Sequence, residues 1–353
     1  MSHLFTIGPV EMYPETLEIA SGQVPYFRND EFSQVVNNVN AGLKRLLFNE
    51  KGENILLTCS GTGAMEAVVM NCFDDDDNLI VIDGGSFGHR FVEICEVHKI
   101  PHKVIEVEQN EILTSEKIEN AISGEKFTGL LVNLDETSIG KLYDIKMLSE
   151  ICERHDLIFV IDAISSFLAD ELDMDKYGVD ATILSSQKAL SLAPGLSIVS
   201  LSEKMLKRVE KIDSGSIYFD FKDYLKNAER GQTPFTPAVR IIIELEDIIR
   251  EFEEKGIDNI IEDTHEIAAY FRKRITEIGL SYPEYPLSNA LTPVIFPDDN
   301  AETVYRRLID EYGFTVNPSG GEYAKSMFRV SHVGNHSIET TEELILAIEN
   351  IIK

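Results

Sequence analysis

Two charged residues stand at or shortly after the end of an apolar run of this sequence, where a buried strand would end. Lys188 follows the run 180–184 and precedes the run 196–201, and Asp162 follows the run 157–161. Burying either charge costs free energy unless a partner compensates it. Asp162 could serve only to cap the next turn, and the Lys188 ammonium could reach solvent along its aliphatic stem. The other interpretation is a reactive amine that works with a carboxylate.

Small residues open the helical pattern that follows the run 54–58. Ser60, Gly61 and Thr62 stand at its start. Free N–H groups and hydroxyls at a helix N-terminus form a phosphate site, although an ordinary Ser or Thr cap has the same sequence pattern. Glu66 stands where a dinucleotide-binding motif needs its third glycine, and the lysine of a Walker motif is missing. We therefore exclude these two nucleotide motifs.

Phe87 stands among glycines in the turn after the run 79–82. Its ring could pack beneath the loop as a hydrophobic staple, or it could lie against a planar ligand. A planar, phosphorylated pyridine aldehyde needs a phosphate site, a ring surface, an acid for its ring nitrogen and an amine that carries it. All four features occur in this chain, which predicts pyridoxal 5'-phosphate as the cofactor.

The composition is that of an ordinary globular protein. The chain has 353 residues, 43% of them hydrophobic, which is enough for two domains or for one large domain with an appendage. Lys and Arg total 32 against 61 Asp and Glu, a net charge of -29. Such a charge repels phosphate backbones and anionic membrane surfaces, so we expect neither nucleic acid nor a membrane as a partner.

Metal binding and export are not expected either. The four cysteines are scattered without C-x-x-C spacing, which predicts neither a zinc site nor a disulfide framework. The acidic run 74–77 lacks the alternating ligands and the glycine of a calcium loop, so we interpret it as a solvated turn. The N-terminus does not resemble a signal peptide, and no run approaches the ~20 apolar residues that span a bilayer. We expect a cytoplasmic protein.

The residues described above need a scaffold that brings strand ends together. From about residue 54, short apolar runs alternate with amphipathic stretches, a pattern typical of a mostly parallel sheet with helices on both faces. In such sheets, ligands bind beyond the carboxyl ends of the strands. We expect strands at 54–58, 79–82, 103–107, 130–133, 157–161, 180–184 and 196–201, with helices near 62–72, 88–98, 115–122 and 145–155.

The chain changes character after Pro237. A helical pattern runs to about Phe252, pauses at Gly256 and resumes to about Ile278, and short strands and a last helix near 340–352 follow. We expect an N-terminal segment at 1–14, a large α/β domain at 15–255 and a smaller α+β domain at 256–353.

At the level of whole motifs, the sequence resembles the class V (fold type I) aminotransferases that use pyridoxal 5'-phosphate. The resemblance is to the alanine–glyoxylate, serine–pyruvate and 2-aminoethylphosphonate–pyruvate branch in particular, and it covers nearly the whole chain, from Gly8 to Arg329. It implies a mostly parallel seven-stranded sheet flanked by helices, a smaller α+β C-terminal domain, and a homodimer with shared active sites.

The resemblance also implies roles for individual residues. Asp162 would pair with the pyridine nitrogen, and Lys188 would carry the cofactor as a Schiff base. Phe87 would stack on the ring. The other implied positions are Ser60, Gly61 and Thr62 at the phosphate, Ser138 in a turn of the form E-[ST]-[ST]-x-G beside the cofactor, Gln187 near the ring hydroxyl, Thr236 and Thr233 at the phosphate of the neighbouring subunit, and Arg329 and Gly8 at the substrate.

Two positions bear on related chemistries. Phe87 stands where cysteine desulfurases place a histidine, and the last cysteine of the chain is Cys152, so desulfuration is disfavoured. Arg28 either approaches the substrate or forms a salt bridge with Asp30 or Glu31.

The sequence therefore predicts an aminotransferase that works by two half-reactions. Alanine, serine or 2-aminoethylphosphonate would leave an amino group on the cofactor, and pyruvate or glyoxylate would collect it. Lys188 would move the proton at the substrate Cα, which needs a lowered pKa, and the planar fork of Arg329 would bind a carboxylate. Two alternatives stay open: a lyase or decarboxylase with the same cofactor, and a non-enzymatic relative of the fold.

Overall fold

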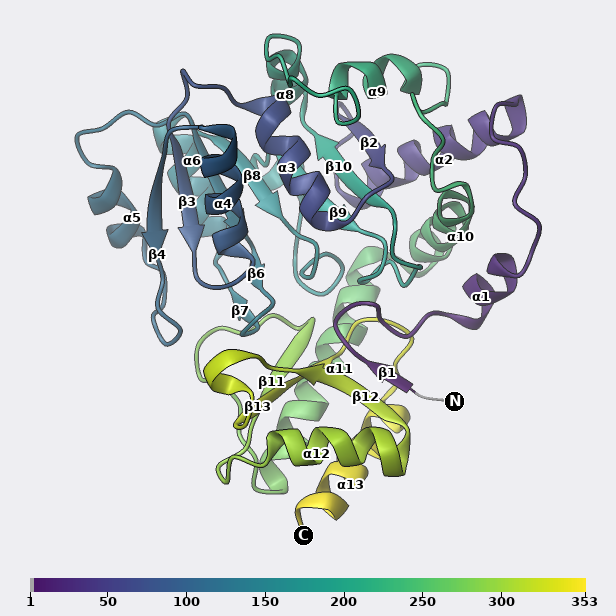
Figure 1. Ribbon diagram of the computed structural model, residues 1–353, viewed down its shortest axis with the longest axis vertical. Coiled ribbons are helices and arrows are strands. Elements are labelled where there is room, and N and C mark those ends of the chain that lie inside the picture. The colour runs from purple at the N-terminus through teal and green to yellow at the C-terminus, as the bar shows by residue number, and fades with distance from the viewer. Residues whose placement is uncertain (1–2) are drawn as a thin grey trace.

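Two sheets organise the protein. Figure 1 shows the computed structural model, which describes residues 3–353, with a seven-stranded sheet in its upper part and a four-stranded sheet below. In the larger sheet, β10 runs antiparallel to its neighbours, and the other strand pairs are parallel. The predicted mostly parallel α/β sheet is thus confirmed. Its strands lie in the order β2 (Glu53–Leu57), β10 (Ser197–Leu201), β9 (Ala181–Ser185), β8 (Ile158–Asp162), β5 (Gly129–Asn133), β3 (Leu79–Asp83) and β4 (His102–Glu106).

Both faces of the larger sheet are buried. Successive side chains of a strand point to opposite faces, so Ile80 and Ile82 of β3 pack in one apolar cluster and Leu79 and Val81 in the other. One face is covered by α2 (Asp30–Leu46), α5 (Ser115–Ile122), α6 (Ile145–His155) and α10 (Val239–Lys255), and the other by α3 (Gly61–Cys72), α4 (Gly88–His98), α8 (Glu203–Val209) and α9 (Phe221–Ala228).

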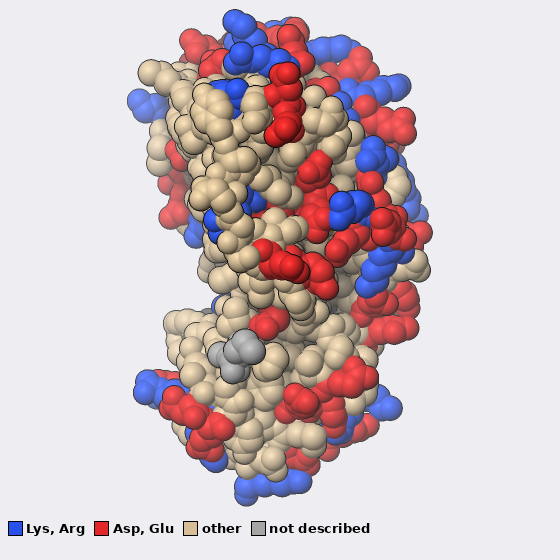
Figure 2. All heavy atoms as spheres, turned by 90° about the vertical axis from the view of Figure 1, so that its right-hand side faces the viewer, with Lys and Arg blue, Asp and Glu red and all other residues tan. Residues whose placement is uncertain are grey.

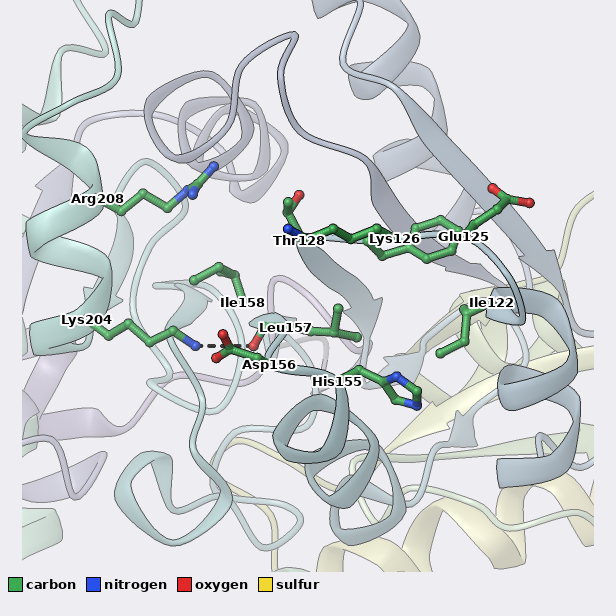
Figure 3. Close-up of a pocket in the computed structure, with 11 residues that line it drawn as sticks. Ile122, Glu125, Lys126, Thr128, His155, Asp156, Leu157, Ile158, Lys204 and Arg208 are labelled. Atoms are coloured by element: carbon green, nitrogen blue, oxygen red, sulfur yellow. Dashed lines mark hydrogen bonds between the residues drawn. The ribbon is translucent and has the colours of Figure 1, made fainter.

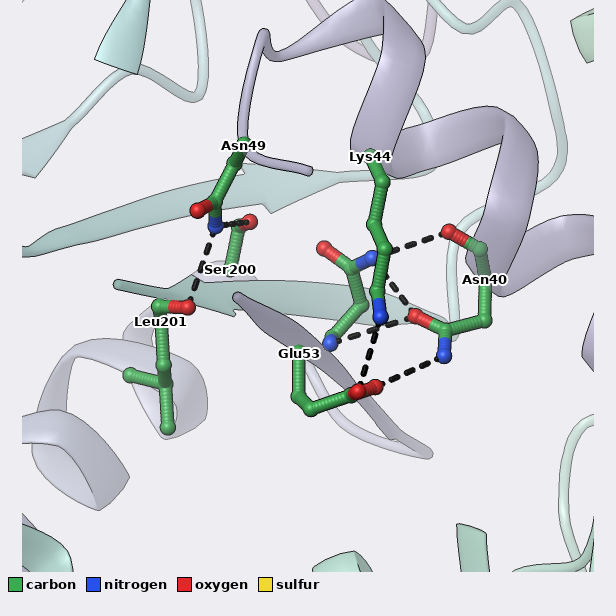
Figure 4. A network of polar contacts seen from close by, with 7 residues as sticks. Asn40, Lys44, Asn49, Glu53, Ser200 and Leu201 are labelled. Carbon is green, nitrogen blue, oxygen red and sulfur yellow. Dashed lines mark hydrogen bonds and ion pairs between the residues drawn. The ribbon is translucent and has the colours of Figure 1, made fainter. Parts of the chain in front are cut away.

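Polar contacts hold α2 to the edge of this sheet (Figure 4). The Asn40 amide and the Lys44 ammonium donate to the two carboxylate oxygens of Glu53 on β2, at 2.8 and 2.7 Å. The Asn49 amide, just beyond α2, donates to the Leu201 carbonyl of β10 at 3.0 Å. Edge strands expose unpaired groups, so these contacts cover an edge that would otherwise be open.

The smaller sheet joins the N-terminal segment to the C-terminal part of the chain. β1 (His3–Phe5) runs parallel to β12 (Phe314–Pro318), and β13 (Met327–Ser331) pairs antiparallel with both β12 and β11 (Leu291–Ile295). Apolar side chains of α11 (Ile257–Glu277), α12 (Ala301–Arg307) and α13 (Ile338–Ile352) pack against it. The expected α+β character of this part is confirmed.

Gly256 separates α10 from α11, and its φ of +86° favours a residue without a Cβ. This break coincides with the predicted boundary at 255, although β1 adds a strand from the segment 1–14 to the smaller sheet. The division into domains stays a prediction. The remaining elements are α1 (Pro14–Ala20), β6 (Asp135–Glu136), β7 (Lys141–Leu142), α7 (Met174–Tyr177), a π-helix (Leu308–Tyr312) and a 3-10 helix (Gly321–Tyr323).

The acidic run 74–77 is only in part the solvated turn that we expected, since Asp75 and Asp76 are exposed but Asp77 is buried. Asp77 is 5% exposed, pairs with the Arg208 guanidinium and accepts a hydrogen bond from the Asp74 N–H at 2.9 Å. A buried carboxylate needs such donors, so the turn is anchored to the fold. Among the described residues, no group of three or more His, Cys, Asp or Glu side chains could hold a metal ion. No helix within 3–353 has the length and apolar character to traverse a bilayer.

Candidate active site

The larger sheet places Asp162 and Lys188 at one edge. Asp162 is the last residue of β8, and Lys188 follows the end of the neighbouring strand β9. The register pairs Asp162 with Ile183 of β9. Each of the two charges affects the pKa of the other group. Both residues therefore lie beyond the carboxyl ends of adjacent parallel strands, where ligands bind in sheets of this kind.

The Asp162 carboxylate is 1% exposed but is supplied with donors. The Asn133 amide donates to one oxygen and the Ile164 N–H donates to the other, each at 2.9 Å. Burial raises the pKa of Asp162 to about 6, while these hydrogen bonds and the Lys188 charge oppose the rise. The group is therefore ionised at neutral pH, and it keeps lone pairs for a cationic partner.

Lys188 is half-buried. Burial lowers its pKa to about 8, the Arg329 charge acts in the same direction, and the Asp135 and Asp162 charges oppose the shift. About a tenth of the amine is then neutral at pH 7, against less than about a thousandth for an ordinary lysine. Gly8 lies against this side chain, because a Cβ at Gly8 would be 2.9 Å from both Cδ and Cε of Lys188. A larger residue at position 8 would displace the amine.

Gln187 continues the loop that carries Lys188. Its side-chain oxygen accepts a hydrogen bond from the Ser185 hydroxyl at 2.8 Å, and its carbonyl accepts one from the Val10 N–H at 3.2 Å. The N-terminal segment is thereby tied to the lysine loop.

The start of α3 forms an open turn at the same edge. Ser60 is the N-cap, but its side chain makes no capping hydrogen bond and is exposed. A Cβ on Gly61 would lie 2.4 Å from Cδ1 of Ile164, so the turn packs against the segment after β8. The Thr62 hydroxyl accepts a hydrogen bond from Arg90 at 2.9 Å. The first N–H groups of a helix have no intrahelical acceptor, which leaves this turn suited to an anion.

The loop that carries Phe87 is held by Glu136, which sequence analysis did not single out. The buried Glu136 carboxylate accepts hydrogen bonds from the N–H groups of Phe87 at 3.2 Å and Gly88 at 2.9 Å. The Ser138 hydroxyl donates to the same carboxylate. A Cβ on Gly85 would lie 2.7 Å from the Ser138 oxygen, so the loop and the turn are in close contact. The Phe87 ring is half-buried and lines a cavity, unlike a staple packed within a core.

This cavity has a volume of about 650 Å³. A hydrogen bond from the Tyr323 hydroxyl to the Gln109 side chain joins two of its walls. Its lining comes from both parts of the protein and consists of Gly84, Gly85, Ser86, Phe87, Gln109, Ser138, Ile139, Ser319, Gly320, Gly321, Tyr323 and Arg329.

Arg329, on β13, belongs to the smaller sheet. Its terminal nitrogens donate to the carbonyls of Thr137 at 2.9 Å and Pro318 at 3.1 Å, while its buried Nε has no partner among the described residues. Burial lowers its pKa, which the Asp135 and Glu136 charges oppose. No described carboxylate forms an ion pair with it, so Arg329 is not part of a surface salt bridge. A guanidinium has five N–H donors, and Arg329 keeps some of them for an anionic ligand.

A second buried carboxyl near these residues was not anticipated. Neither oxygen of Asp135 has a hydrogen-bond partner of ordinary geometry, although the Ser165 hydroxyl is close enough to lower the pKa in part. Burial and then the Asp170 charge raise the Asp135 pKa well above its usual range, and the Lys188 charge opposes the shift. The available signal was its place two residues after the predicted strand 130–133.

The turn that carries Thr233 and Thr236 does not line the cavity. The Thr233 hydroxyl donates to the Phe235 carbonyl at 2.7 Å, and Thr236 is exposed. Arg28 donates to the carbonyls of Thr233 at 2.7 Å and Pro234 at 3.1 Å. The expected salt bridge with Asp30 or Glu31 is therefore wrong for the described residues, because the carbonyls of this turn take the donors of Arg28. Arg28 does not line the cavity, and its approach to the substrate stays a prediction.

A different pocket, of about 420 Å³, lies at the opposite edge of the larger sheet, where β8 begins (Figure 3). Two of its cations are already engaged, since Lys204 pairs with Asp180 at 3.2 Å and Arg208 pairs with Asp77. None of the predicted site residues lines it. Phe87, Ser138 and Arg329 line the cavity of about 650 Å³, so it is the better candidate, although Lys188 and Asp162 are not among its lining residues.

Comparison with known proteins identifies the family. The class-V aminotransferase profile matches residues 20–333. The chain belongs to the class-V aminotransferase family. It is 25% identical to the L-aspartate–glyoxylate aminotransferase of Paracoccus denitrificans over 94% of this chain and 86% of that protein. It is also 25% identical to the serine–glyoxylate aminotransferase of Arabidopsis thaliana over 99% of this chain and 90% of that one.

A solved structure shows the same fold. The alanine–glyoxylate aminotransferase of a Nostoc species superposes with a TM-score of 0.93 at 24% identity, covering 100% of this chain and 95% of that one. The class-V protein described here is thus a transaminase of fold type I, and its family implies pyridoxal 5'-phosphate as the cofactor.

The residues of this transaminase fit that cofactor. The α3 start, with Ser60 uncapped, suits a phosphate, and the half-buried Phe87 offers a ring surface. The buried Arg329 Nε and the Asn133 side-chain oxygen have no partner among the described residues. Unpaired buried polar groups are costly, so these atoms are consistent with a bound polar ligand in the working enzyme.

Proposed function

We propose that this class-V transaminase transfers an amino group from a small donor, namely alanine, serine or 2-aminoethylphosphonate, to pyruvate or glyoxylate in two half-reactions. The observation that carries the proposal is the position of Lys188 and Asp162 at one sheet edge, with their pKa values shifted toward each other. Relatives that act on glyoxylate support the choice of acceptor.

We assign the cofactor contacts to seven residues of this chain. Ser60, Gly61 and Thr62 would hold the phosphate, Phe87 would face the ring, and Asp162 would hold the ring nitrogen. When bound, pyridoxal 5'-phosphate supplies an aldehyde that accepts the amino group and an electron-poor ring that stabilises negative charge at the substrate Cα. Ser138 and Gln187 complete the assignment as the groups beside the ring.

Lys188 performs the proton transfer in this proposal. Its lowered pKa leaves part of the amine neutral at physiological pH, so Lys188 would take the proton from the substrate Cα as a base and would give it up again as an acid. Asp162 would stay ionised and would hold the ring nitrogen of the bound cofactor in its protonated form. Arg329 binds the substrate carboxylate through its free N–H donors, which fixes the orientation of the Cα–H bond.

A panel of donors and acceptors tests the proposed function. Each donor is incubated with the purified protein and either pyruvate or glyoxylate, and the aminated acceptor is measured by mass spectrometry. We expect one oxo acid per aminated acceptor, and no turnover in Lys188→Ala or in Lys188→Arg, which retains the charge but not the reactive amine. Release of carbon dioxide or ammonia without an aminated acceptor would show a decarboxylase or lyase instead.

We also propose a homodimer in which the exposed Thr236, with Thr233 near it, contacts the phosphate of the cofactor that is bound in the partner subunit. Large apolar side chains at Leu17, Tyr26 and Ile217 are 53%, 68% and 85% exposed, and in this proposal a second copy covers them. In the upper half of Figure 2, which looks onto the side that carries α1, charged side chains gather on the right and uncharged ones on the left. Sedimentation velocity tests the dimer, and an active monomer would exclude shared sites.

A further inference from the structure

A single arginine joins two of the proposed cofactor contacts. Arg90 lies in the first turn of α4, and its Nη1 donates to the Thr62 hydroxyl on α3 at 2.9 Å. The same guanidinium lies over the Phe87 ring, 5.3 Å from its centroid. Thr62 follows β2 and Phe87 follows β3, so Arg90 connects the ends of two strands that are not neighbours in the sheet.

The charge of Arg90 is not balanced by a carboxylate. Some arginines of this acidic protein pair with Asp or Glu, as Arg45, Arg154 and Arg274 do, whereas others, such as Arg28 and Arg329, donate to backbone carbonyls instead. Arg90 has no such ion pair among the described side chains. Its guanidinium instead approaches the start of α3, where the helix dipole is also positive. A guanidinium beside the positive end of a helix is unfavourable unless an anion lies close to both.

The hydrogen bond to Thr62 also determines what the hydroxyl can do. A threonine hydroxyl has one proton and two lone pairs, and a guanidinium only donates. Because Arg90 occupies a lone pair, the Thr62 proton is left to be donated elsewhere. The side chain is thereby prepared as a donor to an acceptor such as a phosphate oxygen, and the adjacent positive charge strengthens that hydrogen bond.

The contact with Phe87 constrains the second feature of the site. A guanidinium over an aromatic face is attracted to the ring, and the attraction holds the ring in one orientation. It occupies one face and leaves the other for a planar ligand. Arg90 therefore links the orientation of the ring to the orientation of the phosphate donor.

We propose that Arg90 is a positioning residue that makes this site select phosphorylated over unphosphorylated pyridine aldehydes. The inference rests on the proposed function, and it adds a residue and a ligand preference to it. Arg90 fixes Thr62 as a donor, adds positive charge beside the α3 start, and holds Phe87.

Binding measurements on the cofactor-free full chain test this inference. Pyridoxal 5'-phosphate and pyridoxal are titrated separately into wild type and Arg90→Met, and the visible absorption of the lysine-bound ligand gives each Kd. We expect Arg90→Met to raise the Kd of pyridoxal 5'-phosphate about 10- to 100-fold, the range for losing a charge-assisted contact. The Kd of pyridoxal should change less than about threefold, because it lacks the phosphate. Arg306→Met, at a surface pair with Glu302, is the matched control and should bind both ligands as wild type does.

Different outcomes separate this inference from the proposed function. An unchanged preference for the phosphorylated ligand in Arg90→Met overturns the role of Arg90, as does an equal loss of affinity for both ligands. Failure of wild type to bind either ligand at Lys188 overturns the proposed function itself. Arg90→Gln, which keeps an N–H donor for Thr62 without the charge, is measured alongside in case Arg90→Met does not fold. A wild-type Kd in Arg90→Gln would also overturn the proposal.

Discussion

Opposite pKa shifts at two residues define the chemistry available to this site. Burial lowers the pKa of Lys188 to about 8 and raises that of Asp162 to about 6. Between these values the carboxylate is ionised while part of the amine is neutral, which is the arrangement expected of separate electrostatic and proton-transfer groups. The shifts have a common cause, because both side chains leave water at the same edge of the sheet.

Lys188 should react with amine reagents at a lower pH than an ordinary lysine does. The neutral amine is the nucleophile, so in the cofactor-free protein we expect its acetylation rate to rise with a midpoint near pH 8. A lysine in an unstructured peptide, included as the control, should have a midpoint near ~10.4. Mass spectrometry after brief labelling across this pH range measures both. Coincident midpoints would contradict the lowered pKa.

Asp162→Asn should keep the cofactor bound but slow removal of the substrate Cα proton by about 100-fold or more. A neutral amide cannot stabilise positive charge on the ring nitrogen, whereas the contacts proposed for the phosphate are unchanged. Stopped-flow absorption during the half-reaction with alanine measures the rate. Asp298→Asn, at an exposed position, should react as wild type does. An unchanged rate in Asp162→Asn would mean that this acid is not the partner of the ring.

At the scale of elements, the segment from β5 to β7 organises the site. Asn133 at the end of β5 binds Asp162, Glu136 on β6 binds the loop of Phe87, and the Thr137 carbonyl binds Arg329. This one segment thereby supports Asp162, Phe87 and Arg329, which come from different parts of the chain. Rigid support of this kind is what keeps catalytic groups in a productive geometry.

Glu136→Gln should loosen the loop that carries Phe87. The amide presents one acceptor oxygen and an NH2 group to donors that the carboxylate now satisfies, namely the N–H groups of Phe87 and Gly88. We expect the free energy of unfolding to fall by about 1–3 kcal/mol, and the Kd of pyridoxal 5'-phosphate to rise. Urea unfolding and absorption titration measure the two effects. Glu302→Gln, on the surface, serves as the control, and equal urea midpoints for both variants would remove the proposed role of Glu136.

At the scale of the whole molecule, both sheets and the N-terminal segment come together near Lys188. Arg329 of the smaller sheet is close enough for its charge to lower the pKa of Lys188, and Gly8 of the N-terminal segment lies against the Lys188 side chain. Burial at this junction also has a cost. Asp135 is fully buried there with unpaired oxygens, and its pKa is raised well above the usual range. The folded state therefore resists ionisation of a group that ionises readily in the unfolded chain.

Asp135→Asn should stabilise the cofactor-free protein at neutral pH. The stability linked to Asp135 is fully present below its unfolded pKa of ~3.9 and is lost as the pH rises toward its higher folded pKa. The gain in unfolding free energy over wild type should therefore grow between about pH 4 and 7 and reach about 1–3 kcal/mol. Urea unfolding at several pH values measures the difference, with Asp298→Asn as an exposed control. A gain that does not depend on pH would show that the stabilisation comes from packing and not from the raised pKa of Asp135.

Much of the fold could be predicted because its signals are local. The strands of the larger sheet begin and end within one residue of the predicted bounds, since apolar runs and small-residue turns are read directly from the chain. No helix was predicted before residue 54, although α2 buries a regular apolar stripe that includes Phe32, Val36 and Val39. That pattern was available in the sequence.

The sequence by itself determined which residues carry chemistry and that they follow strand ends, because residue type and strand periodicity are properties of neighbouring positions. Only the tertiary structure decided which distant residues support them. Arg90 reaches Thr62 across 28 positions, and Arg28 turns to carbonyls more than 200 positions away instead of to nearby acids. Such partners are selected by packing of the whole chain, since a buried donor or acceptor must find its complement wherever the fold places one.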